Sequence, residues 1–150
     1  MAKLARQQLV EYVGHVLYEK AMWDWVIGQL GPDFQAGGQR NAMVEVFVLH
    51  SRALVEFFRS KRSSDDVIAA DYAPEWDSDE DLDAMVRTLQ SMNKRWGHLS
   101  ASRLDEEGRI HDLDEWIENS HRMGRTWERF IERLDDEMKI AFQAPATGAP

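Results

Sequence analysis

The sequence predicts an all-α protein, a bundle of four long amphipathic helices with mixed up-down packing. Three observations indicate this class. Apolar residues recur at three- and four-residue spacing along four stretches; glycine, proline and helix-capping patterns separate these stretches; and the sequence contains no internal repeat. The 150 residues suffice for one domain that buries roughly 70% of its unfolded surface. We expect this domain over residues 1–143 and a flexible tail over 144–150.

The first helix is expected from about Lys3 to Leu30, where Gly31-Pro32 ends it. Its main apolar stripe consists of Leu9, Tyr12, Val13, Val16, Trp23, Ile27 and Leu30. After a glycine-rich loop, the second helix is expected over Asn41–Arg59. The apolar side chains on one side of this helix are Met43, Val46, Phe47, Ala53, Leu54 and Phe57.

A longer connection over 63–77 contains several large apolar residues, which predicts a loop pinned to the bundle by its side chains. Ser78 followed by Asp81 has the pattern of a capping box and predicts the start of a third helix. This helix is expected to reach about Trp96, with Gly97 as its stop. The fourth helix follows Asp112, and its apolar stripe contains Trp116, Ser120, Met123, Trp127, Ile131, Leu134 and Met138.

The charge and composition exclude several classes of protein. A net charge of −9 disfavours nonspecific binding to nucleic acid or to an anionic membrane. The chain has no cysteine, which excludes disulfides, thiolate metal sites and cysteine nucleophiles. No signal peptide, membrane span or phosphate-binding loop is recognisable. We therefore expect a cytoplasmic protein without a cofactor.

Two polar residues fall on apolar stripes, and they are the main candidates for function. His50 lies in the middle of the second stripe, and Asn93 lies on the apolar side of the third helix. Buried polar groups need partners. The two side chains either form a polar pair in a cavity that binds a ligand or transfers a proton, or satisfy each other, a backbone carbonyl or a water and fix the helix register.

A second apolar stripe on each of the first two helices raises the question of an interface. On the first helix the stripe comprises Tyr18, Ala21, Met22 and Trp25, and on the second it comprises Val44, Val48 and Val55. Either both helices are central and packed on two sides, or they form the interface of a homodimer or bind a protein partner. The interface residues would then be Tyr18, Met22, Trp25, Val44, Val48 and Val55.

Charged residues suggest further sites, each with a simpler alternative. Glu118 and His121 have the ExxH spacing of a metal site, and Glu11 and His15 at i, i+4 could also share an ion. The first pair lies opposite the apolar stripe and is expected to face water. Along the second helix, charges of alternating sign indicate exposed ion pairs or the wall of a site; they are Glu45, Arg52, Glu56 and Arg59. The acids Asp65, Asp66 and Asp71 indicate caps and turns, or paired acids.

The middle half of the chain, from Ala42 to Leu99, carries several recognisable runs: Val48–Phe58, Asp65-Asp66-Val67, Asn93-Lys94 and Gly97-His98-Leu99. These runs resemble a group of uncharacterised bacterial helical proteins with LLHxRxLxEFF, DDV and NKxxAHL motifs, although Gly97 replaces the usual alanine. More remotely, the chain is similar to the HEPN class of helical RNases and nucleotide-binding proteins. No arginine here is followed four to six residues later by histidine, which is the catalytic signature of that class.

Two functions follow from these patterns. The first is a non-catalytic helical module that acts through homodimerisation or a protein partner. The second, which the HEPN resemblance implies, is a nucleotide- or RNA-binding protein or a degenerate RNase. Its polar pocket would contain His50, Asn93, Lys94 and His98, with Lys94 contacting phosphate and a histidine moving protons.

Overall fold

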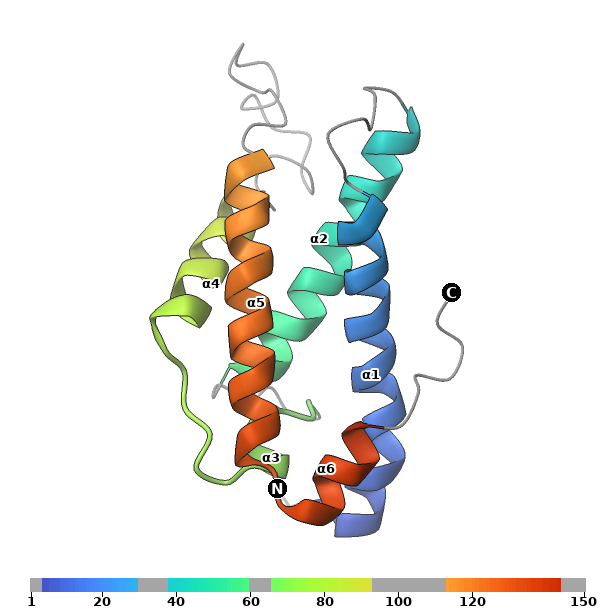
Figure 1. The fold of residues 1–150 in the computed structure, drawn as a ribbon, viewed down its shortest axis with the longest axis vertical. Coiled ribbons are helices and arrows are strands. Elements are labelled where there is room, and N and C mark those ends of the chain that lie inside the picture. The colour runs from blue at the N-terminus through green and yellow to red at the C-terminus, as the bar shows by residue number, and fades with distance from the viewer. Residues whose placement is uncertain (1–3, 30–37, 60–65, 93–112, 144–150) are drawn as a thin grey trace.

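The computed structural model describes residues 4–29, 38–59, 66–92 and 113–143. These residues form the all-α fold that the sequence predicts, with six helices and no strand among them (Figure 1). The helices are α1 (Arg6–Gln29), α2 (Gly38–Phe58), α3 (Ala69–Tyr72), α4 (Glu80–Met92), α5 (Leu113–Arg133) and α6 (Asp136–Phe142). In the described ranges, no helix has the length and apolar character needed to cross a membrane.

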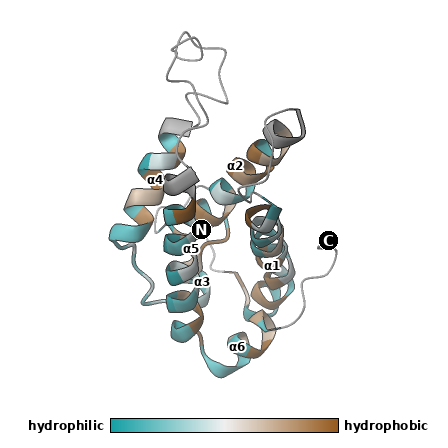
Figure 2. Ribbon diagram, turned by 45° about the horizontal axis from the view of Figure 1, so that its top comes forward, coloured by the Kyte–Doolittle hydropathy of each residue, from teal (hydrophilic) through white to brown (hydrophobic). Residues whose placement is uncertain are grey.

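The long helices α1 and α2 lie side by side and run in opposite directions (Figure 1). α2 also packs against α4, and α4 packs against α5. At the lower end of the view in Figure 1, α6 crosses beside the first turns of α1, and α3 lies beside the end of α2. Figure 2 shows hydrophobic and hydrophilic residues sharing each of the long helices. Their buried apolar side chains, together with those of α3 and α6, form one core cluster.

The buried face of α1 agrees with the predicted stripe at four positions and differs at two. Leu9, Val13, Val16 and Trp23 are buried as expected; Tyr12 is 44% exposed, and Val26, which belongs to neither predicted stripe, is fully buried. Val26 follows Trp23 by about one helical turn, so the buried face continues along the side that meets α2.

α2 is packed on two sides, which corrects one part of the interface prediction. Val44, Val48 and Val55 are at most 9% exposed, and the core cluster of this chain contains all three. Because α1 covers one side of α2 and α4 another, these valines belong to internal packing. They are therefore not a surface available to a partner.

The connection before α4 is pinned to the core, as predicted, but it also contains the short helix α3. Tyr72 and Trp76 are buried; the Tyr72 hydroxyl donates to the Leu9 carbonyl at 3.1 Å, and Trp76 Nε1 donates to the Phe58 carbonyl at 2.7 Å. Burial raises the pKa of the Tyr72 phenol. The Asp71 carboxylate accepts from the Ile68 amide at 3.1 Å, which agrees with the interpretation of this acid as a cap.

Two helix starts differ from the expected ones by the identity of the capping residue. The Asp79 carboxylate, rather than Ser78, accepts from the third amide of α4, that of Leu82, at 3.0 Å. The predicted fourth helix also breaks after α5, and Asp135 caps a separate helix, α6, by accepting from the Met138 amide at 3.0 Å. The expectation of one continuous stripe from Trp116 to Met138 is therefore wrong.

An aromatic cluster fills the end of the core where α3 and α6 lie. Phe130 is fully buried at its centre, and its ring lies 5.3–6.3 Å, centroid to centroid, from six other rings. Most of these contacts are edge-to-face, the arrangement that aromatic quadrupoles favour. The other members of this aromatic cluster are Phe57, Phe58, Tyr72, Trp76, Trp127 and Phe142.

Arginines spaced four residues apart on α5 fasten the segment that leads into α4. Arg125 forms two 2.8 Å hydrogen bonds with the Asp81 carboxylate, Arg129 pairs with Asp79, and Arg133 donates to the Glu75 carbonyl at 2.7 Å. The guanidinium of Arg129 also stacks 4.6 Å from the centre of the Trp76 ring. Beside Arg125, the pKa of Asp81 is held below its usual range.

Candidate functional site

His50 is buried, as the sequence predicts, and its partner is an acid on α1. The side chain is 6% exposed, and its Nδ1 lies 2.6 Å from the Glu19 Oε2 atom. Because an ionised carboxylate can only accept a hydrogen bond, Nδ1 carries the proton in this pair. The Tyr18 ring meets the imidazole edge-on, with 6.1 Å between centroids. His50 is therefore held between two consecutive residues of α1.

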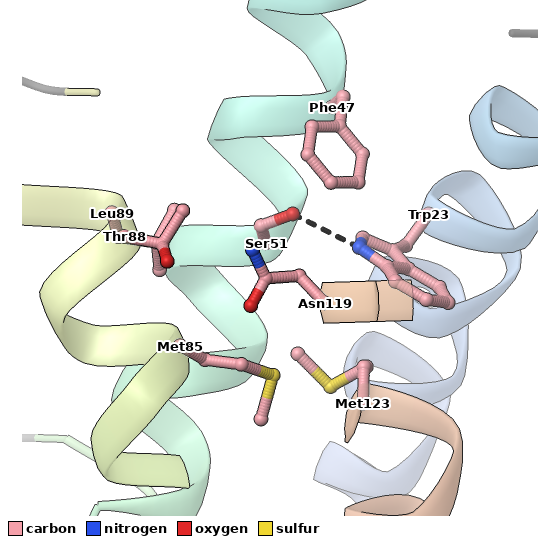
Figure 3. Close-up of a pocket in the computed structure, with 8 residues that line it drawn as sticks. All are labelled: Trp23, Phe47, Ser51, Met85, Thr88, Leu89, Asn119 and Met123. Atoms are coloured by element: carbon pink, nitrogen blue, oxygen red, sulfur yellow. Dashed lines mark hydrogen bonds between the residues drawn. The ribbon is translucent and has the colours of Figure 1, made fainter. Parts of the chain in front are cut away.

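Ser51, the next residue, points to the opposite side of the α1–α2 contact. Its Oγ accepts a 2.9 Å hydrogen bond from Trp23 Nε1 and lines a cavity with about 20 Å³ of free space (Figure 3). The Asn119 side chain enters the same cavity from α5 and accepts from Arg122 Nη1 at 3.2 Å. The cavity is lined by Trp23, Phe47, Ser51, Met85, Thr88, Leu89, Asn119 and Met123.

The size of this cavity limits its chemistry. Small-molecule sites typically measure about 300–1,000 Å³, whereas the free space of about 20 Å³ here has room for about one water molecule. His50 does not line it. The cavity is therefore a gap in the core with a few polar groups on its wall, and it does not match the polar pocket expected around His50.

The other residues of the expected pocket are Asn93, Lys94 and His98, and they lie outside the described residues. Their proximity to His50 stays a prediction. Sequence reasoning missed Glu19, because an acid that flanks an apolar stripe usually faces water. A signal was present in the helical spacing: an imidazole on an apolar face needs a polar partner, and Glu19 lies four residues before Trp23, on the same side of the helix as the α1 stripe.

The charged line on α2 divides into an exposed pair and one half-buried residue. Arg52 Nε donates to Glu56 Oε1 at 2.8 Å, and both side chains are more than half exposed. This pair confirms the exposed-ladder interpretation at those positions. Arg59 is half-buried and lines a groove between α2 and α4 together with Val55, Leu89 and other residues.

The residues with the spacing of metal ligands do not form a metal site in the described part of the chain. Glu118 lies 3.4 Å from Arg122 and 3.7 Å from Arg125, and His121 is exposed. His15 is also exposed, with its ring 5.8 Å from that of Tyr12. Nowhere in the described ranges do three histidine, aspartate or glutamate side chains gather as a ligand set.

One apolar surface is left on the outside of α1 and α2. The contacts of Glu19 with His50 and of Trp23 with Ser51 fix the register, which places Met22 level with Leu49. On both helices, the side chains next to the His50–Glu19 pair and away from the core are apolar and at least partly exposed. We name this surface the α1–α2 face; it consists of Tyr18, Met22, Trp25, Val46, Leu49 and Ala53.

The α1–α2 face retains the α1 half of the predicted interface and replaces its α2 half. Leu49 is 62% exposed and Trp25 is 36% exposed, so the face combines a protruding leucine with an aromatic side chain. Neither residue is needed to fill the core. No family model, curated protein or solved structure matches the chain, so this geometry and the motif residues are the basis for assigning a function.

Proposed function

We propose that this chain is a non-catalytic helical module that works as a homodimer, with the α1–α2 face of one copy packed on that of the second. The observation that carries the proposal is Leu49, a large apolar side chain left 62% exposed in the middle of α2. Exposed apolar patches on soluble proteins commonly mark interaction sites, and two-fold dimers are the commonest assembly.

The charges beside the face support a second copy as the occupant. Glu45 and Arg52 lie on the same flank of α2, about one turn on either side of Leu49. When two copies of α2 pack antiparallel with Leu49 on the two-fold axis, Glu45 of each copy comes level with Arg52 of the other. The interface is then self-complementary, with an apolar centre and two ion pairs at its edge.

The buried polar groups support a role that does not involve catalysis. Nδ1 of His50 is bound to Glu19, Ser51 is bound to Trp23, and the core cavity has room for about one water molecule. Each polar side chain on the α1–α2 contact thus has a structural partner. These bonds fix the register of the two helices that carry the face.

The proposal is tested by native mass spectrometry and sedimentation equilibrium of the purified chain. We expect the mass of two chains for the natural sequence and of one chain for Leu49→Glu, because a buried unpaired charge opposes association. Ile140→Glu is the matched control: Ile140 is 72% exposed on α6, away from this face, and the variant should remain a dimer. A natural chain that stays monomeric at all concentrations would overturn the proposal.

A charge exchange tests the geometry of the interface. Glu45→Arg alone should weaken association, since it places arginines of the two copies against each other. Adding Arg52→Glu should restore much of the dimer, because the pairs re-form with reversed signs. If the double variant associates no better than Glu45→Arg, the antiparallel arrangement around Leu49 is wrong.

A further inference from the structure

A groove between α2 and α4 contains an arginine without a carboxylate partner. The groove has about 130 Å³ of free space, which is less than a drug-sized ligand needs but enough for a small molecule. Its floor is apolar and is formed by Val55, Val86 and Leu89; its walls carry Arg52, Glu56, Arg59 and Gln90. Val55 and Leu89 are both less than 9% exposed. The groove is therefore amphipathic, with a carbon-lined base and charged edges.

The charges on the walls do not cancel. Arg52 and Glu56 neutralise each other through their 2.8 Å hydrogen bond, which leaves the positive charge of Arg59. Arg59 is half-buried, and no hydrogen bond or ion pair joins its guanidinium to a residue in the described part of the chain.

We propose that this groove binds a small organic anion with an apolar body. The Arg59 guanidinium would bind the carboxylate or phosphate head group through charge-assisted hydrogen bonds. The Gln90 side-chain amide, across the groove, would donate a further hydrogen bond. The apolar body would contact Val55, Val86 and Leu89 and would cover the partly exposed Val86 from water. Charge complementarity selects an anion, and the apolar floor selects an alkyl chain as its body.

This site shares Arg52 with the edge of the proposed dimer interface, but its floor and Arg59 are separate from the apolar centre of that interface. Val55 points to α4, whereas Leu49 and Val46 lie on the outer side of α2 next to α1. A ligand in the groove would therefore bind to the monomer and to the dimer alike. Failure of one proposal leaves the other standing.

The test uses the full chain and four probes that share an eight-carbon body: octanoate, octyl phosphate, 1-octanol and octyltrimethylammonium. Binding is followed by methyl NMR of valines and leucines and quantified by titration calorimetry up to about 10 mM, the range for a ligand of this size. We expect octanoate or octyl phosphate to shift the methyl signals of Val55, Val86 and Leu89. The tighter of the two anions identifies the head group as carboxylate or phosphate.

Arg59→Gln should weaken binding of the anion about tenfold or more, the effect of losing hydrogen bonds to a charged group. The matched control is Arg87→Gln, which removes the same charge from an exposed position on α4 outside the groove and should bind as the natural chain does. Equal affinity of Arg59→Gln and the natural chain would overturn the anion site, as would equal affinity for 1-octanol and octanoate. Absence of any shift at the three methyl-bearing residues would overturn the site altogether.

Discussion

The two ends of the core differ in what fills them. At one end, six aromatic rings meet around Phe130, and the Tyr72 hydroxyl and Trp76 Nε1 both donate to backbone carbonyls. At the other end, Ser51, Thr88 and Asn119 line a cavity beside flexible methionines. Rings that interlock edge-to-face leave little space, whereas the polar groups at the other end lie beside room for about one water molecule.

This difference in packing explains why the short helices lie at the aromatic end of the core. The aromatic end fixes α3, α6 and the segment before α4, none of which is long enough to be stable by itself. The cavity end is formed by the middle turns of α1, α2, α4 and α5, which support one another as long helices. We therefore expect each buried residue at the aromatic end to contribute more to the free energy of unfolding than each buried residue at the cavity end.

The largest expected effect is the loss of the central ring. Phe130→Ala should lower the free energy of unfolding by about 3–5 kcal/mol, because it opens a void and removes ring contacts. Met123→Ala at the cavity end, where Met123 is 1% exposed, should cost less, about 2–3 kcal/mol. Urea denaturation followed by circular dichroism measures both. Equal losses would contradict the ranking of the two ends.

A smaller effect is expected from the polar bond beside the cavity. Ser51→Ala leaves Trp23 Nε1 buried without its 2.9 Å acceptor, which should cost about 1–3 kcal/mol. Thr126 offers the opposite case: its hydroxyl is buried with no hydrogen-bond partner in the described part of the chain. Thr126→Val, which keeps the shape and removes that hydroxyl, should raise the free energy of unfolding by about 1 kcal/mol.

The two substitutions together decide whether polar groups in this core are structural. If Ser51→Ala is as stable as the natural chain, water in the cavity replaces the missing acceptor, and the bond has little structural weight. If Thr126→Val is destabilising instead, the hydroxyl has a partner that appears only in solution. Chemical unfolding curves of the two variants, recorded side by side, separate these outcomes.

The sequence predicts the helices well because helical periodicity is local, and it predicts their partners poorly because those depend on how helices cross. The burial of His50 follows from its place on an apolar stripe, but Glu19 as its partner requires the register of α1 against α2. Phe130 shows a related limit. It lies one position before Ile131 on the predicted stripe, and the crossing of α5 over its neighbours turns this position, rather than Ile131, fully inward.

The start of α6 was not predicted, although the sequence around it contains a helix-capping pattern. The run Asp135-Asp136-Glu137 has the same acidic composition as Asp79-Glu80-Asp81, and both begin a helix with an aspartate cap. Read in the same way, the first run predicts the break before α6. The α2 valines had no such signal, because a helix packed on two sides and a helix with an interface show the same two stripes in sequence.

The smallest expected effect concerns two ion pairs, that of Asp81 with Arg125 and that of Asp135 with Arg6. Hydrogen bonding to Arg125 lowers the pKa of Asp81, and hydrogen bonding to Arg6 lowers that of Asp135, which joins α6 to α1. A carboxyl whose pKa is lower in the folded chain stabilises the fold at pH values above its pKa in the unfolded chain, about 3.9. This stability is lost as the pH falls through the pKa of the folded chain.

Unfolding curves between about pH 5 and 2.5 should therefore be less acid-sensitive for Asp81→Asn and for Asp135→Asn than for the natural chain. The change should be larger for Asp81, whose side chain is 27% exposed against 53% for Asp135, because solvent screens the more exposed pair. A greater change for Asp135→Asn would mean that the contact of α6 with α1, rather than that of α4 with α5, yields first in acid.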